Sequence, residues 1–506
     1  MILAIAPFIT AQEPADALRT SWNAHGGTAR TKAIGGAMGS LGGDITATFV
    51  NPAGLAFYKT GDFVLSPQYQ FGRTKSTYFN RTEQDKTNRF NWGTSGIVIG
   101  GGDGRGNIRN VTFSLAMNRT ADFSSDVLYR GENNQSSFSQ KFVEELNRNG
   151  VTSPGAAEFN FPMGASLVYN THWIDSVSTP NGQISHFVTN APVSSGLLQQ
   201  YTSTSKGGIY DLALGLAANI QDKLMIGGTI GLPILNYKRE TEFLEADASG
   251  NTNNAFNYGL FADKLHTSGI GINARLGLIY KPAEFWRLGL AVHSPSFFSL
   301  TDRYEADVKL NDDVPDDMAW GDHSKSYNDD QPFEFKYDLM TPYRVIGSIS
   351  YVLREIEDVT KQRGFLTADV EYVNHKASSF TPSDEVNTGE SDRNYLKNLN
   401  NAIDNAYKGA FNFRVGGELK FTTIMVRLGA AYYGNPYKNI QGEKGSKLNL
   451  SGGLGYRHKG IFVDLTYVHA VNKDVHFAYR LANSPYFGAN MKNSAGNVFL
   501  TLGFKI

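Results

Sequence analysis

The chain has 506 residues, of which 41% are hydrophobic and 12% aromatic, with 47 basic and 48 acidic side chains, 53 glycines and no cysteine. Its formal net charge of −1 provides no bulk attraction to nucleic acid, so we expect no nucleic-acid partner. Without cysteine, disulfides, thiolate metal sites and cysteine nucleophiles are excluded.

Residues 1–11, MILAIAPFITA, form an apolar stretch about as long as the hydrophobic core of a signal peptide. Ile9-Thr10-Ala11 resembles a small-residue cleavage site, although the basic segment that usually precedes such a core is missing. We expect residues 1–11 to be the remnant of an export signal. The alternative is an ordinary buried N-terminal segment.

Residues 12–60 contain no long alternating segment. ADALRTSWN (15–23) has the pattern of a short helical turn, and the following residues mix glycine with Ala, Ile, Met and Phe. Asn51 can cap or turn the chain, and Pro52 sets its direction. We expect a compact unit of short helices, in which small residues allow close packing.

Residues 61–506 alternate with period two over most of their length. In IYDLALGLAANI (209–220), every second residue from Tyr210 to Ile220 is apolar, and these residues share one face. The residues between them, on the other face, are small or polar. Many segments reach the ~9–11 residues of a tilted membrane strand, and aromatic residues gather near their ends. These features indicate strands facing lipid on one side and a wet lumen on the other. The alternative, a soluble β-sandwich or propeller, is disfavoured because no blade-length repeat is visible.

Short connections alternate with long ones, the longest being 124–207, as in bacterial outer-membrane barrels. We therefore predict an all-β fold, a transmembrane antiparallel β-barrel of about 14 strands, whose lumen is too wide for wall side chains alone to fill. The predicted strands are 62–79, 92–100, 108–123, 208–220, 223–241, 257–281, 285–306, 333–353, 363–379, 408–421, 423–436, 446–458, 460–475 and 494–506.

Residues 35–56, GGAMGSLGGDITATFVNPAGLA, precede this predicted barrel and resemble the hatch of the FadL/TodX family of outer-membrane transporters. The Asn-Pro-Ala motif of that hatch corresponds to Asn51, Pro52 and Ala53. The resemblance implies that residues 12–60 plug a barrel formed by 61–506. It also implies passive uptake of hydrophobic compounds, with long-chain fatty acids expected and aromatic hydrocarbons compatible, across the outer membrane of a Gram-negative bacterium.

The resemblance further implies a greasy landing site in loop 124–207 and a pocket beside the hatch. Helical spacing in SFSQKFVEELNRNG (137–150) aligns apolar residues, and a second piece, AAEFNFPMGASLVYNTHWI (156–174), is rich in aromatics. The alternative is that these residues only pack the loop onto itself. Arg30, Lys32 and Arg19 are candidates to meet a carboxylate, but pairing with a wall acid such as Asp211 or Glu418 is favoured for them. The expected ligand-binding residues are Phe49, Leu55, Phe57, Phe138, Phe142, Leu146, Phe159, Phe161 and Arg30.

Members of the family release ligand sideways through a gap made by a kink in the third strand. Here that strand, NIRNVTFSLAMNRTADF (107–123), contains no Gly or Pro to mark a bulge, so the sequence does not support an opening. The alternative is a bulge that forms without Gly.

We expect a monomer that meets outer-membrane lipid and lipopolysaccharide, is inserted by the outer-membrane assembly machinery, needs no cofactor or metal and is not an enzyme. A general porin for polar solutes is the first alternative, although a porin needs no N-terminal plug. A barrel enzyme is the second, although no Gly-x-Ser-x-Gly nucleophile motif is present.

Overall fold

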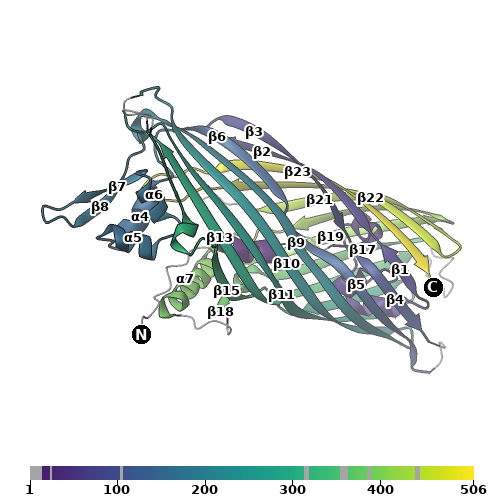
Figure 1. Cartoon of the computed structure of the whole chain (residues 1–506). Coiled ribbons are helices and arrows are strands. Elements are labelled where there is room, and N and C mark those ends of the chain that lie inside the picture. Colours follow the sequence, from purple (N-terminus) through teal and green to yellow (C-terminus); the bar gives the residue numbers. More distant parts are fainter. Residues whose placement is uncertain are drawn as a thin grey trace.

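Figure 1 shows the computed structural model of the chain, which describes residues 14–22, 26–102, 106–252, 254–312, 318–353, 363–383, 389–438 and 445–506. Fourteen antiparallel wall strands form a closed barrel, and six of them are interrupted and carry two labels each. In chain order the wall strands are β1–β2 (Asp62–Leu65, Pro67–Tyr78), β3–β4 (Arg81–Trp92, Ser95–Gly101), β5–β6 (Ile108–Asp122, Ser125–Asn133), β9 (Leu197–Ile220), β10 (Leu224–Asp247), β11 (Tyr258–Ala283), β12–β13 (Trp286–His293, Phe297–Asn311), β15–β16 (Phe333–Met340, Arg344–Leu353), a ninth formed by β17 and β18 (Gly364–Asn374, Ser379–Pro382), β19 (Gly409–Phe421), β20 (Ile424–Tyr433), β21 (Ser446–His458), β22 (Ile461–His476) and β23 (Ala489–Lys505).

The first and last wall strands close the barrel. β23 pairs antiparallel with both β1 and β2, so that Asp62 lies opposite Lys505. Gly61 and Ile506 exchange backbone hydrogen bonds of 3.2 and 2.8 Å just beyond this pair. An even number of strands returns the chain to the end where the barrel began. The predicted fold class is thus confirmed.

The apolar face of the alternating strands points outward. On β9, Leu212, Leu214 and Leu216 are 43, 52 and 58% exposed. Asp211 and Ala213, which alternate with these leucines along the strand, are buried. A surface of this kind suits contact with hydrocarbon, because lipid supplies the apolar surroundings that a soluble protein would have to find in its core. No helix within the described ranges is long and apolar enough to span a membrane.

Several strands are longer than the alternation predicts. The second wall strand begins at Arg81 rather than 92, the fourth begins at Leu197 rather than 208, and the fifth ends at Asp247 rather than 241. These extensions carry polar residues on both faces, as in TEQDK (82–86), so they lack the one-sided apolar pattern that marks the membrane part. They raise the wall beyond the apolar band on the side of the long loops.

Four short helices of the hatch occupy the lumen, where Figure 1 draws them in purple inside the barrel: α1 (Pro14–Ser21), α2 (Ala29–Ala33), α3 (Ala47–Val50) and η1 (Pro52–Phe57). Hydrogen bonds attach α2 to the wall, since Ala29 N–H donates to Thr501 Oγ1 (2.8 Å) and its carbonyl accepts from Thr466 Oγ1 (2.7 Å). Residues 12, 13 and 23–25 of the predicted hatch lie outside the described residues.

Loop 124–207 and its neighbours cover one end of the barrel (Figure 1). This loop supplies β6, three helices, α4 (Gln140–Arg148), α5 (Pro154–Asn160) and α6 (Ala165–Asn170), and a hairpin formed by β7 (Ile174–Ser178) and β8 (Ile184–Thr189). Further along the chain lie η2 (Val193–Ser195), β14 (Ala319–His323), η3 (Ser324–Tyr327), η5 (His375–Ala377) and α7 (Glu390–Ala406).

Candidate functional site

The Asn51-Pro52-Ala53 turn joins α3 to η1. Asn51 is fully buried and extended (φ −143°), as suits a residue before proline. Its side-chain oxygen accepts a hydrogen bond from Ala53 N–H (3.1 Å), which caps η1. Its side-chain NH₂ donates to the carbonyl oxygens of Gly39 (2.5 Å) and of Leu278 (3.3 Å) on β11. One side chain therefore caps a hatch helix and attaches the hatch to the wall.

Inward-facing glycines let the hatch backbone lie directly against the wall. A Cβ added to Gly277 would overlap the side-chain oxygen of Asn51, and one added to Gly289 would overlap the carbonyl oxygen of Gly39. At Gly289 the hatch backbone therefore lies directly against the wall, whereas at Gly277 the Asn51 side chain occupies the space. Gly227, Gly416 and Gly429 make contacts of the same kind with Pro52, Ile34 and Gly35.

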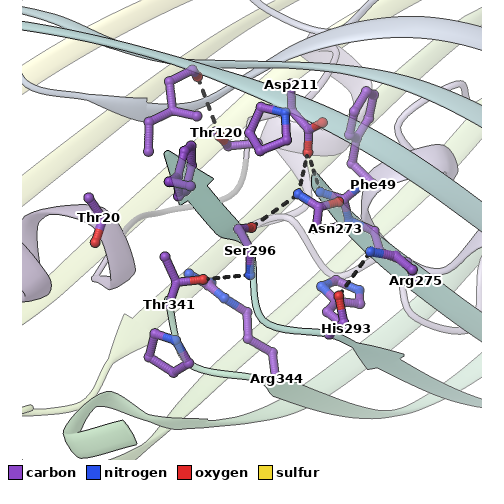
Figure 2. Close-up of a pocket in the computed structure, with 16 residues that line it drawn as sticks. Thr20, Phe49, Thr120, Asp211, Asn273, Arg275, His293, Ser296, Thr341 and Arg344 are labelled. Carbon is purple, nitrogen blue, oxygen red and sulfur yellow. Dashed lines mark hydrogen bonds and ion pairs between the residues drawn. The ribbon is translucent and has the colours of Figure 1, made fainter. Parts of the chain in front are cut away.

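A cavity of about 70 Å³ lies between the hatch and the wall (Figure 2). Phe49 of α3 forms its hatch side, and Asp211, Asn273 and Arg275 form its wall side. The Arg275 guanidinium makes an ion pair with Asp211 and lies over the Phe49 ring at 5.5 Å. This inner cavity is polar and holds at most a few water molecules, so the hatch is closed against a large ligand in this state.

The other predicted hatch residues pack against the wall. Leu55 is fully buried, and its side chain contacts the position of Gly215 on β9. Phe57 lies beneath the Arg287 guanidinium at 4.6 Å. Of Phe49, Leu55 and Phe57, only Phe49 lines the inner cavity.

Arg30 is engaged inside the hatch. Its Nη1 donates to the carbonyl of Gly43 (2.8 Å), and its Nε lies 3.6 Å from Glu418 Oε2. This is the pairing with a wall acid that the sequence favoured, whereas the other wall acid, Asp211, pairs with Arg275. Arg30 lines neither the inner cavity nor the outer cavity described next.

The outer cavity has a volume of about 360 Å³ and lies between the helices of loop 124–207 and the raised part of the wall. Phe138 stacks on Phe243 of β10 with ring centroids 4.3 Å apart, and Phe142 lies 5.5 Å from Phe261 of β11. Phe161 completes the loop side. Three of the five residues predicted in this loop therefore meet at one cavity.

The two remaining loop residues lie elsewhere. Leu146, one turn after Phe142 on α4, is fully buried and does not line the outer cavity; it belongs to the hydrophobic core of the loop. Phe159 is 55% exposed on α5. Part of the apolar set of this loop therefore lines a cavity, as a landing site would require, and part packs the loop onto itself, as the alternative stated.

Charged groups border this aromatic lining. The Lys141 ammonium lies over the rings of Phe138 (4.1 Å) and Phe142 (4.5 Å), within cation–π range. Glu145, one turn further along α4, also lines the cavity, and its burial raises its pKa although Lys141 and Arg148 act in the opposite direction. The cavity thus combines aromatic rings with both basic and acidic side chains.

The sequence prediction missed the wall side of the outer cavity. Tyr201 lies on the part of β9 that was assigned to a loop, and Phe243 lies just past the predicted end of its strand. Phe261 fell within a predicted strand but was not assigned to the site. The extensions carry polar residues on both faces, so no one-sided alternation marked Tyr201 or Phe243 as wall residues.

The wall is interrupted at the third strand, where β5 ends at Asp122 and β6 begins at Ser125. β5 pairs with β4 and β9, but within the described part of the chain β6 pairs only with β9, and β3 only with β2. The register against β9 also shifts between Arg119 and Ala121. The strand is therefore irregular although no Gly or Pro marks the bend in its sequence.

Polar side chains replace the missing backbone ladder between β3 and β6. Thr87 Oγ1 donates to Asp126 Oδ2 (2.8 Å), and Arg89 Nη2 lies 3.0 Å from the same oxygen. Arg130 pairs with Glu83 at 2.8 Å. Side chains can move aside at a lower energetic cost than a backbone ladder can break, so this break can open more easily than a hydrogen-bonded seam.

Two solved structures share this architecture. A Pseudomonas aeruginosa FadL homologue superposes with a TM-score of 0.53 at 12% identity, over 95% of this chain and 98% of its own. The Pseudomonas putida toluene transporter TodX superposes with a TM-score of 0.51 at 13% identity, over 96% of this chain and 99% of its own. No protein-family model and no curated protein sequence matches the chain. The chain therefore has the fold that the FadL homologue and TodX share, as the hatch motif predicted.

Proposed function

We propose that this protein is a monomeric channel for passive uptake of hydrophobic compounds across the outer membrane of a Gram-negative bacterium, with long-chain fatty acids as its ligands. Support comes from the lipid-suited outer surface, the filled lumen and a fold shared with a toluene transporter. Outer-membrane assembly machinery inserts the barrel, and movement of the ligand is down its gradient.

The observation that carries this proposal is the outer cavity. Its aromatic lining can bury an alkyl chain, since each Å² of apolar surface removed from water contributes ~25 cal/mol. Lys141 at the border provides a cation for a carboxylate, which a hydrocarbon such as toluene would not use. The combination favours fatty acids over uncharged hydrocarbons.

From the outer cavity the ligand moves toward the hatch and leaves through the break between β3 and β6. Lateral release into the bilayer spares the apolar chain a second exposure to water, and so retains the hydrophobic free energy gained on capture. The break is bridged by side chains and not by backbone, so it can open without disrupting the barrel.

The first test is mass spectrometry of organic extracts from the purified, detergent-exchanged protein, with conductance measured in planar bilayers. We expect co-purified fatty acids and almost no conductance from the whole chain, and loss of the ligand and open conductance after deletion of residues 12–57. An empty protein that already conducts ions freely would instead establish the alternative, a general porin.

A second test separates fatty acids from hydrocarbons. Lys141→Met keeps the apolar stem over the Phe138 and Phe142 rings and removes the charge. We expect about tenfold weaker binding of a long-chain fatty acid and unchanged binding of toluene. Lys397→Met, on the exposed face of α7, is the matched control. Equal loss for both ligands would show that Lys141 only supports the shape of the cavity.

A further inference from the structure

Five cations gather on the outer surface of four neighbouring strands. Arg73 and Lys75 lie on β2, Lys86 on β3, Lys473 on β22 and Lys492 on β23, and all five are exposed. These strands lie side by side across the closure of the barrel (Figure 1). We call this group the basic patch.

The strand register places these cations directly opposite one another. Lys473 lies opposite Lys492, Lys492 opposite Lys75, and Arg73 opposite Lys86. Directly opposed residues of an antiparallel pair point to the same face, and neighbouring strands are only ~4.8 Å apart. Like charges in such pairs destabilise a sheet. The arrangement therefore calls for an external anion.

Acidic side chains of the wall do not supply this counter-charge. In the described residues, no member of the basic patch forms a salt bridge. Glu83 and Asp85 alternate with Lys86 along β3 and face the other way, and Glu83 pairs with Arg130. The outward positions that border the patch are uncharged: Thr77, Thr82, Gln84, Ser446, Val471, Val475, Asn490 and Ser494.

The basic patch lies at the height of a lipid headgroup. Tyr69, Phe71 and Arg73 are successive outward residues of β2, and the two aromatic residues, both exposed, lie between Arg73 and the centre of the wall. This order is that of an aromatic girdle. At the other end of β23 lies exposed Phe504, about 12 residues from Lys492. At ~3.3 Å per residue and a tilt of ~40°, this separation spans ~30 Å along the membrane normal, slightly more than the apolar band of an outer-membrane barrel.

We propose that the basic patch binds the phosphorylated headgroup of a lipid in the outer leaflet, namely the phosphates of the lipid A part of lipopolysaccharide. This inference rests on the proposed outer-membrane location. Opposed cation pairs can share one phosphate between two strands, and a headgroup with two phosphates can bridge the Lys473–Lys492–Lys75 row and the Arg73–Lys86 pair. Below the headgroup, acyl chains would contact Phe71 and Tyr69.

The test compares the detergent-solubilised whole chain with the triple variant Lys75→Gln/Lys473→Gln/Lys492→Gln. Binding of diphosphorylated lipid A is measured by native mass spectrometry, with and without millimolar inorganic phosphate. The control, Lys223→Gln/Lys459→Gln/Lys505→Gln, makes the same charge change at exposed positions at the opposite end of the barrel. Heat-modifiable migration in gels confirms that all three proteins are folded barrels.

We expect the triple variant to bind lipid A at least ~10-fold more weakly than the wild type, and the control to bind like the wild type. Equal affinity in the triple variant would overturn the proposal. Displacement of lipid A by inorganic phosphate at equal concentration would also overturn it, since the patch would then be a site for free phosphate. Fatty-acid binding, measured on the same samples, should be unchanged in the triple variant, so failure of the basic patch and failure of the proposed transport function are distinguishable.

Discussion

The side-chain oxygen of Asn51, in the hatch, lies so close to Gly277 of β11 that a methyl group on Gly277 would overlap it. On the neighbouring wall strands, a methyl group on Gly289 would overlap the backbone of Gly39, and one on Gly227 would overlap the backbone of Pro52. We call these three glycines the glycine seat. Since the Asn51 amide also bonds to the wall through Leu278, the closed position of the hatch depends on contacts with no spare space.

Gly277→Ala should displace the hatch. The added methyl group has no free volume, and overpacking of this kind typically destabilises by ~1–3 kcal/mol. We expect lower thermal stability and a measurable conductance in planar bilayers from a barrel that is closed in the wild type. Gly347→Ala, where an added Cβ meets nothing within 4 Å, is the control and should conduct no more than the wild type. A silent Gly277→Ala channel would show that the seat tolerates a side chain.

The hatch should also respond to pH through Lys32 of α2. Burial, reinforced by Arg414, lowers the pKa of Lys32 from 10.5 to about 8. Between these values the unfolded chain binds more protons than the folded one, so the free energy of unfolding should rise with pH over this window. Below pH 8 the charged lysine destabilises the hatch in full, and above 10.5 it does not.

Urea unfolding of the wild type and Lys32→Gln, followed from pH 7 to 10.5, checks this expectation. Lys32→Gln should be the more stable protein at pH 7, and the difference should shrink as pH passes 8. Lys59→Gln, at an exposed position after η1, controls for the loss of a positive charge. Parallel pH profiles for wild type and Lys32→Gln would contradict the assignment.

Alternation of apolar and polar residues was enough to predict the barrel, because every membrane-facing strand must separate lipid from a wet lumen. It fails where that constraint ends. The raised wall around Gln199 and Thr82 carries polar residues on both faces, so nothing in its pattern distinguishes it from a loop. The bend at Phe123 was equally hidden, because it contains no Gly or Pro and depends in part on a neighbouring strand, where the Gly207 carbonyl accepts a hydrogen bond from Phe123 N–H (3.1 Å).

Helical spacing in the loop predicted an aligned apolar set, of which Phe138 and Phe142 line the outer cavity and Leu146 does not. Phe138 and Phe142 meet at the outer cavity because Phe142 lies on α4, Phe138 just precedes that helix, and the cavity side of α4 packs on the wall. Phe159 was assigned with them on composition, yet the short α5 turns it to solvent. Loop helices are oriented by long-range contacts such as the one between Phe138 N–H and Glu245 (2.9 Å), which no local pattern reveals.

Phe138, which lines the outer cavity, and Phe159, which is exposed, provide a matched pair of substitutions that tests the role of this cavity. Phe138→Ala removes a ring that stacks on Phe243 and should weaken binding of a long-chain fatty acid ~10- to 100-fold, as expected for losing one buried aromatic contact. Phe159→Ala removes a ring of the same size from the same loop and should leave the affinity unchanged. Equilibrium binding of a radiolabelled fatty acid measures both. Equal effects would place the ligand outside this cavity.

The break between β3 and β6 gives the last prediction, which uses the absence of native cysteine. The side chains of Thr87 and Asp126 meet across the break at 2.8 Å, so Thr87→Cys/Asp126→Cys places two thiols where a short bis-methanethiosulfonate reagent can join them through reducible disulfides. If ligand leaves through this break, joining its sides should abolish uptake of radiolabelled fatty acid in cells and leave binding at the outer cavity intact. Reduction should restore uptake.

The control for this cross-link is Thr77→Cys/Thr82→Cys, at side chains that meet at 3.0 Å across the intact β2–β3 ladder. The same reagent bound there adds a similar bulk to the same strand, yet it ties together two strands that are already hydrogen-bonded. Uptake should therefore persist. If both cross-linked pairs transport normally, the ligand passes the hatch instead of the wall, and the side chains bridging β3 and β6 only hold the bend closed. Selective loss in the Thr87/Asp126 pair would locate the exit at this break, where side chains instead of backbone join the described wall.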